Sequence, residues 1–100
     1  MKAYELLTIL KPTIDTEEVE QNINKLKDVI TSFNGNVLET NDMGRKKLAY
    51  ETQNFRDGYF YVLTFELPPE KVADFKRQVK LNDNIIRTMF VTVEHPALAK

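Results

Sequence analysis

Residues Gly58-Tyr59-Phe60-Tyr61-Val62-Leu63-Thr64-Phe65-Glu66-Leu67 form the longest apolar-rich run of the chain. The run is rich in aromatic and β-branched residues and lies between Asp57-Gly58 and Pro68-Pro69, so we predict a central β-strand. Successive side chains of a strand point to opposite faces of the sheet. We expect one face in the core, with Tyr59, Tyr61, Leu63, Phe65 and Leu67. The other face has Phe60, Val62, Thr64 and Glu66, and what covers it bears on the function.

Two amphipathic segments flank this strand. The first has an apolar stripe at spacings of four and three over about 18 residues, which predicts a helix with Val19, Ile23, Leu26, Ile30 and Phe33 on its buried side. Asp15 is the predicted N-cap, Glu18 completes a capping box, and Asn34-Gly35 ends the helix with the glycine in the left-handed conformation. The second helix, of about 12 residues, follows Pro68-Pro69 and buries Val72, Phe75 and Val79.

Three other segments are predicted strands. Residues 3–10 are apolar on both faces, which is typical of a strand in the middle of a sheet. Residues 37–50 form a long strand with a bulge or bend near Gly44, and polar residues 51–57 make the turn into the strand at 58–67. Residues 85–94 form the last strand.

The predicted order β-α-β-β-α-β is that of the ferredoxin-like fold. We therefore predict an α+β sandwich, in which a four-stranded antiparallel sheet has both helices on one face because right-handed crossovers place them on the same side. Strands 3–10 and 58–67 lie at the centre. One hundred residues suffice for one modest core, so residues 1–100 are a single domain with a short flexible tail at 95–100.

The charge of the chain is unevenly distributed, although its formal net value is only −1. Residues 13–44 hold seven acids against two bases, whereas residues 45–100 hold ten bases against seven acids. This asymmetry permits a local basic surface on a nearly neutral protein. The absence of cysteine fits an intracellular setting, and we expect a cytoplasmic protein with no signal peptide and no membrane association.

No recognisable active site occurs in the sequence. The single histidine, His95, stands beside a proline in the tail, and the chain has no cysteine to pair with it. Metal-ligand spacings are missing, and three widely separated glycines cannot build a phosphate-cradling loop. We expect a protein that is not an enzyme, with no catalytic residue, no metal, no cofactor and no small-molecule substrate.

The uncovered face of the predicted sheet carries an apolar patch between Glu5, Glu66 and Arg87. Monomeric proteins rarely leave a contiguous apolar patch of more than a few hundred Å² exposed. We expect another protein, a second copy of this chain or stacked bases to pack there, unless the tail at 94–100 folds over it. The patch consists of Leu7, Ile9, Phe60, Val62, Met89 and Val91.

The densest positive run is Arg45-Lys46-Lys47, with Tyr50 on the same predicted strand. Lysine and arginine neutralise phosphates, and a nearby tyrosine stacks a base or packs on a sugar, so the run is a candidate RNA contact. Edge strands also use lysine to block sheet-to-sheet aggregation, and the run alone leaves both interpretations open.

Four motifs carry a resemblance to a known family: Ala3-Tyr4-Glu5, Gly44-Arg45-Lys46-Lys47-Leu48-Ala49-Tyr50, Gly58-Tyr59-Phe60 and Leu81-Asn82-Asp83-Asn84-Ile85-Ile86-Arg87. Over essentially the whole chain the sequence resembles bacterial small-subunit ribosomal protein six. The resemblance implies the ferredoxin-like fold and a structural role in the small ribosomal subunit. It also implies a pairing with small-subunit ribosomal protein eighteen and joint binding to the central domain of 16S rRNA during assembly.

The resemblance also suggests site residues. The implied RNA contacts are Arg45, Lys46, Lys47 and Tyr50, with Lys2 and Arg87 as secondary candidates. The resemblance adds Tyr4 as a partner-protein contact to the six residues of the apolar patch, which the uncovered face of the predicted sheet already suggests. The near-neutral charge fits a protein that relies on a basic partner for much of its RNA affinity.

Two alternatives share the predicted topology. An RNA-recognition motif would bind single-stranded RNA, and Gly58-Tyr59-Phe60-Tyr61-Val62 partly resembles its third-strand signature. The match fails at Phe60, where that signature requires a small residue, and residues 3–10 offer no aromatic on the uncovered face. A homo-oligomeric ligand-binding module on the same fold is the other alternative, because fold does not fix function.

Overall fold

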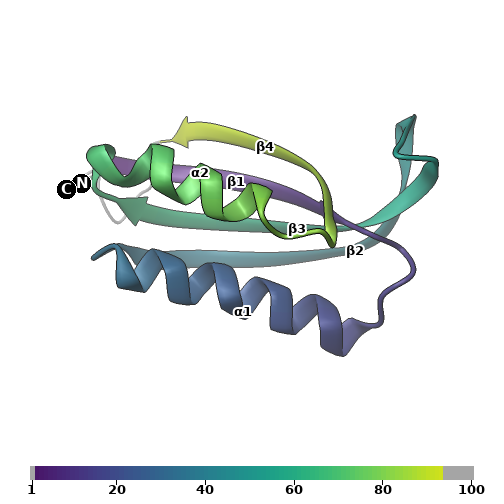
Figure 1. Cartoon of the computed structure of the whole chain (residues 1–100), viewed down its shortest axis with the longest axis horizontal. Helices are drawn as coiled ribbons and strands as arrows, with labels where there is room; N and C mark the ends of the chain where they lie inside the picture. Colours follow the sequence, from purple (N-terminus) through teal and green to yellow (C-terminus); the bar gives the residue numbers. More distant parts are fainter. Residues whose placement is uncertain (1, 94–100) are drawn as a thin grey trace.

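A computed structural model describes residues 2–93 of the chain (Figure 1). The elements run β1 (Lys2–Leu10), α1 (Thr16–Ser32), β2 (Asn36–Thr52), β3 (Phe55–Leu67), a 3₁₀ turn η1 (Pro69–Lys71), α2 (Val72–Lys80) and β4 (Ile85–Val93). The predicted order and the ferredoxin-like fold class are confirmed. The expectations for the tail, both its flexibility at 95–100 and its packing over the sheet at 94–100, lie outside the described residues.

The sheet has the strand order β2-β3-β1-β4, with each neighbouring pair antiparallel and β1 and β3 at the centre, as predicted. The core lies on one face, between the sheet and the two helices (Figure 1). Phe65 of β3 and Phe75 of α2 are fully buried, and their ring centroids lie 5.0 Å apart. The predicted core face of β3 is confirmed by the burial of Tyr61, Leu63, Phe65 and Leu67, and Tyr59 is half-buried against the same core.

Helix α1 begins as predicted, but the residue that adopts the left-handed conformation after its end is not the predicted one. The Asp15 carboxylate accepts a hydrogen bond from the Glu18 N–H at 2.8 Å. The left-handed residue after the helix is Asn34, with φ 65°, and not Gly35. Gly35 is needed for space instead, because an added Cβ would lie 2.4 Å from the Glu66 carbonyl oxygen. The prediction placed the left-handed conformation one residue too late.

The hairpin between β2 and β3 is longer than predicted. Strand β2 continues to Thr52 and β3 begins at Phe55, so Gln53 and Asn54 alone form the turn, with φ of 51° and 68°. Two consecutive positive φ values are those of a type I′ hairpin turn. The predicted turn at 51–57 was wrong, because the polarity of these residues reflects exposure to solvent and not irregular backbone.

The predicted bulge near Gly44 is confirmed. The pairing of β2 with β3 shifts register between Asp42 and Gly44, and Gly44 has φ 76°. Beyond this bulge the hairpin bends away from α1 (Figure 1). We call residues 45–58, which form the far part of this hairpin, the arm.

Candidate functional site

The arm gathers the basic run that the sequence singled out. Arg45, Lys46 and Lys47 are exposed, and Tyr50 is 77% exposed. Across the turn, β3 adds Arg56, so the arm holds four basic and two acidic residues and a net charge of +2. A protein of net charge −1 therefore has a local cationic projection.

The three consecutive basic side chains do not point the same way. Arg45 pairs with Tyr59 and Lys47 pairs with Asp57, whereas Lys46 pairs with Gly58. Because paired residues of a sheet share a face, Arg45 and Lys47 lie on the side of the helices and Lys46 lies on the uncovered side. The arm can thus present charge on both of its faces.

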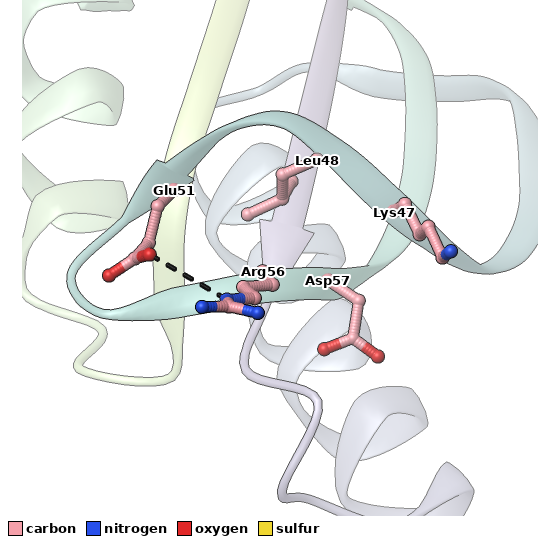
Figure 2. A pocket seen from close by; sticks show the side chains of 5 residues that line it. All are labelled: Lys47, Leu48, Glu51, Arg56 and Asp57. Carbon is pink, nitrogen blue, oxygen red and sulfur yellow. Dashed lines mark ion pairs between the residues drawn. The ribbon is translucent and has the colours of Figure 1, made fainter.

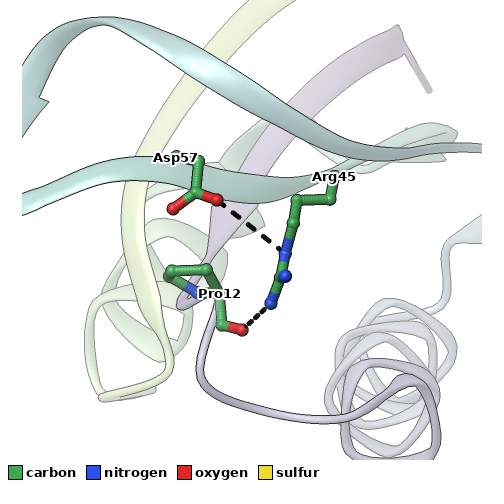
Figure 3. Close-up of polar contacts among 3 residues, drawn as sticks. All are labelled: Pro12, Arg45 and Asp57. Atoms are coloured by element: carbon green, nitrogen blue, oxygen red, sulfur yellow. Dashed lines mark hydrogen bonds and ion pairs between the residues drawn. The ribbon is translucent and has the colours of Figure 1, made fainter.

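Arg45 is bound to other parts of the chain. Its Nη2 donates a hydrogen bond to the carbonyl oxygen of Pro12, and its Nε lies 4.0 Å from Asp57 Oδ2 (Figure 3). The side chain is nevertheless 58% exposed. The sequence motif alone could not show this contact, because Pro12 lies 33 residues away in the chain.

A hollow of about 610 Å³ lies on the arm between its two strands (Figure 2). Its lining residues are Lys47, Leu48, Glu51, Arg56 and Asp57. The Arg56 Nε lies 3.8 Å from Glu51 Oε2, and the Arg56 side chain is 90% exposed. Arg56 is absent from the predicted site residues because its polar neighbours in the sequence indicate a turn there. The signal that could have found it is the pairing of β2 with β3 beyond Gly44.

The apolar patch on the uncovered face is assembled as the topology predicted. Leu7 lies between Val62 and Met89, and Ile9 lies between Phe60 and Arg87. Met89 is 55% exposed and Val91 is 39% exposed, whereas Leu7, Phe60 and Val62 are half-buried. Ile9 belongs to this face but is only 5% exposed, so it offers little area to a partner.

The arm and the apolar patch are contiguous. A smaller hollow of about 180 Å³ is lined by Leu48 and Ala49 of the arm together with Leu7, Phe60 and Met89 of the patch. Arg87 lines the same hollow and is exposed, so it stands at the boundary between cationic and apolar surface. The structure therefore brings Arg87 beside Leu48 and Ala49 of the arm.

Two predicted site residues do not join this surface. Tyr4 as a partner contact is wrong: it is 5% exposed and lies in the core, with its ring 5.1 Å from Phe90 and 6.1 Å from Phe65. The physical reason is alternation, which turns Tyr4 toward the helices when Leu7 faces away from them. Lys2 is exposed but pairs with Leu67, at the end of β3 opposite the arm.

The Leu81–Arg87 motif has a structural use within the described chain. The side-chain oxygen of Asn22 on α1 accepts hydrogen bonds from the amides of Asn82 at 2.6 Å and Asn84 at 3.4 Å. The Asn22 amide in turn donates to the Glu18 carbonyl oxygen at 2.6 Å. These amides fasten the α2–β4 connection to α1.

The described residues offer little to acid–base or metal chemistry. The Tyr59 hydroxyl donates to Asp42 Oδ2 at 2.8 Å, and this bond raises the pKa of Tyr59 above its ordinary value. Burial raises the pKa of Tyr61, so both phenols remain protonated at neutral pH. Between residues 2 and 93, no group of three or more His, Cys, Asp or Glu side chains could hold a metal ion. None of the helices in that range is both long and apolar enough to cross a membrane.

Comparison with known proteins gives one consistent result. A family described as "Ribosomal protein S6" matches residues 3–92. A protein of Campylobacter concisus named small ribosomal subunit protein bS6 is 39% identical over 95 residues, which cover 95% of this chain and 68% of that protein. The bS6 protein of a Sulfurovum species is also 39% identical over 95 residues, covering 95% and 73% of the two chains.

A solved structure agrees with the sequence relatives. The crystal structure of 30S ribosomal protein S6 from Thermotoga maritima has a TM-score of 0.87 to this chain at 25% identity, and the match covers 92% of this chain and 87% of that one.

Proposed function

The chain belongs to the ribosomal protein S6 family, and from this membership we propose that it binds the central domain of 16S rRNA together with small-subunit ribosomal protein eighteen during assembly. It is a protein of the small subunit of the cytoplasmic ribosome. Its relatives are structural ribosomal proteins, which are not enzymes.

The contiguity of the apolar patch and the cationic arm is the observation that supports a joint protein and RNA interface. We place the partner protein on the exposed part of the patch, at Leu7, Phe60, Val62, Met89 and Val91. We place the RNA on the arm, at Lys46, Lys47, Tyr50 and Arg56, with Arg87 at the boundary. A partner seated on the patch would contact Leu48 and Ala49 as well, because the arm and the patch share one hollow.

The charges explain why two proteins would be needed. Lysine and arginine supply most of the affinity for nucleic acid by releasing counterions from phosphates. The arm has a net charge of only +2, and the whole chain has −1. Binding by the isolated chain should therefore be weak and should strengthen when the partner adds its own basic residues beside the arm.

The test measures affinity for a central-domain fragment of 16S rRNA, with and without the partner, at several salt concentrations. Met89→Asp would remove partner-dependent binding, because it buries a charge in an apolar contact. Lys46→Ala with Lys47→Ala would weaken RNA binding and leave partner binding unchanged. Lys76→Ala on α2, where the ammonium lies 4.7 Å from the Phe90 ring centroid, is a control for loss of one positive charge away from the arm.

Three results would overturn the proposal. The first is full-strength binding of the rRNA fragment by the isolated chain without the partner. The second is an arm variant that binds the rRNA fragment as tightly as the Lys76→Ala control does. Tight binding of short single-stranded RNA by the isolated chain, abolished by Phe60→Ala, would instead favour the RNA-recognition-motif alternative.

A further inference from the structure

The direction of the arm depends on contacts outside the β-ladder. At Gly44 the pairing with β3 shifts register, and the Gly44 N–H donates to Asp42 Oδ1 at 3.0 Å. A bulge of this kind interrupts the ladder and bends the strand. The ladder resumes beyond the bulge with Arg45 opposite Tyr59, so contacts with the rest of the molecule act together with the ladder in setting the direction of the arm.

Arg45, the first residue of the arm, supplies such a contact on the side of the helices. It donates to the Pro12 carbonyl oxygen in the β1–α1 connection and approaches the Asp57 carboxylate on the opposite strand of the arm (Figure 3). The β1–α1 connection is itself fixed, since the Lys11 N–H donates to the Asn84 carbonyl oxygen at 2.8 Å. One guanidinium therefore links both strands of the arm to an anchored point.

The turn at the tip gives the arm a second point of contact with the rest of the chain. There the Gln53 Nε2 donates a hydrogen bond to the carbonyl oxygen of Ile86 in β4 at 3.4 Å. Contacts at the base of the arm, through Arg45, and at its tip, through Gln53, restrict swinging about the Gly44 bulge.

We propose that Arg45 is a positioning residue, which latches the arm to the β1–α1 connection and so aims Lys46 and Lys47 at the RNA, and that it is not itself a phosphate contact. The inference rests on the proposed function and deepens it by dividing the basic run into one latch and two RNA-binding residues. A planar guanidinium can serve two acceptors at a fixed angle, and a lysine ammonium cannot reproduce this geometry. The same two acceptors compete with any phosphate for the Arg45 donors.

The first test uses the free protein and needs no RNA. Arg45→Met removes the latch, and Lys47→Met is the matched control, because it removes a neighbouring exposed charge on the same face. We expect hydrogen exchange of the arm amides, residues 45–58, to accelerate about three- to tenfold in Arg45→Met, as loss of one exposed charged contact implies, and to stay unchanged in Lys47→Met. Equal exchange in the two variants would overturn the latch.

The second test uses the complex with rRNA and the partner protein. Each lost phosphate contact reduces the slope of log affinity against log salt concentration by about 1. Lys47→Met should reduce the slope by this amount, whereas Arg45→Met should weaken binding several-fold at every salt concentration with the slope unchanged. Arg45→Lys, which keeps the charge but loses the fork, should behave like Arg45→Met.

The results separate this inference from the function on which it rests. A reduced slope in Arg45→Met, restored by Arg45→Lys, would make Arg45 a phosphate contact and refute the positioning role. If Lys47→Met leaves RNA binding unchanged, the proposed function of the arm is wrong and the positioning role falls with it. The exchange measurement then still decides whether Arg45 orders the arm.

Discussion

Asn22→Ala should destabilise the fold more than its position on a helix surface suggests. Asn22 is only 6% exposed, and its side-chain oxygen accepts the amides of Asn82 and Asn84. Removing the Asn22 side chain deletes three hydrogen bonds, including the one that it donates to the Glu18 carbonyl oxygen, and leaves two amides without their acceptor in a partly buried place. At about 1 kcal/mol for each of the two short bonds and a further cost for the unsatisfied donors, we expect a loss of about 2–3 kcal/mol in the free energy of unfolding.

The matched control is Asn24→Ala on the same helix, because Asn24 is exposed. Both variants gain helix propensity, at most about 0.7 kcal/mol, so the difference between them isolates the amide cluster. Urea denaturation gives both free energies, and a deficit of 2 kcal/mol corresponds to a melting temperature about 8–16 °C lower in a domain of this size. Equal stabilities of the two variants would refute the structural role of the amide cluster.

Two further predictions concern backbone space and pH. Gly35→Ala should cost about 1–3 kcal/mol of unfolding free energy, because its Cβ would lie 2.4 Å from the Glu66 carbonyl oxygen. Gly44→Ala meets no atom within 4 Å and should cost only the strain of a positive φ, about 1–2 kcal/mol; a larger loss in urea denaturation at Gly44 than at Gly35 would contradict both. In the folded state the hydrogen bond to Asp42 raises the pKa of Tyr59. The contribution of this bond to the free energy of unfolding is therefore complete below the unfolded pKa of about 10 and is lost as pH rises through the folded pKa. Tyr59→Phe should therefore lose less stability between neutral pH and pH 11 than the parent chain, and parallel pH profiles would exclude this linkage.

Periodicity sufficed for most of the fold. The alternation in residues 58–67 separated Phe65 and Leu63 from Phe60 and Val62 correctly, because one face of the sheet is covered and the other is not. Periodicity failed where a polar sequence can mean either a turn or a strand that is exposed to solvent. Residues 51–57 are polar because the hairpin extends beyond the core, and a strand without a buried face leaves no period in its sequence.

The candidate site was less predictable than the fold, because contacts between distant segments determine it. The sequence shows that the run of Arg45, Lys46 and Lys47 begins with an arginine, but it does not show that this arginine contacts another segment. The distinction depends on the β1–α1 connection, where Pro12 accepts a hydrogen bond from Arg45 although it lies 33 residues away in the chain. The position of Tyr4, in contrast, was predictable from the sequence. Alternation along the strand already excluded Tyr4 from the face of Leu7, and only the resemblance suggested it as a partner contact.

Leu48 and Ala49 lie where the two proposed binding surfaces meet, the apolar patch and the arm. These residues continue the strand that carries Lys46 and Lys47, and they also border the apolar hollow beside Phe60. A protein packed on the patch would contact Leu48 and Ala49 and would further restrict the arm that Arg45 positions, so the RNA would bind with a smaller loss of conformational entropy. Binding free energies are linked reciprocally, so RNA on the arm must strengthen the protein contact by the same factor. Cooperative binding of the proposed protein partner and RNA would then follow from the geometry of one hairpin.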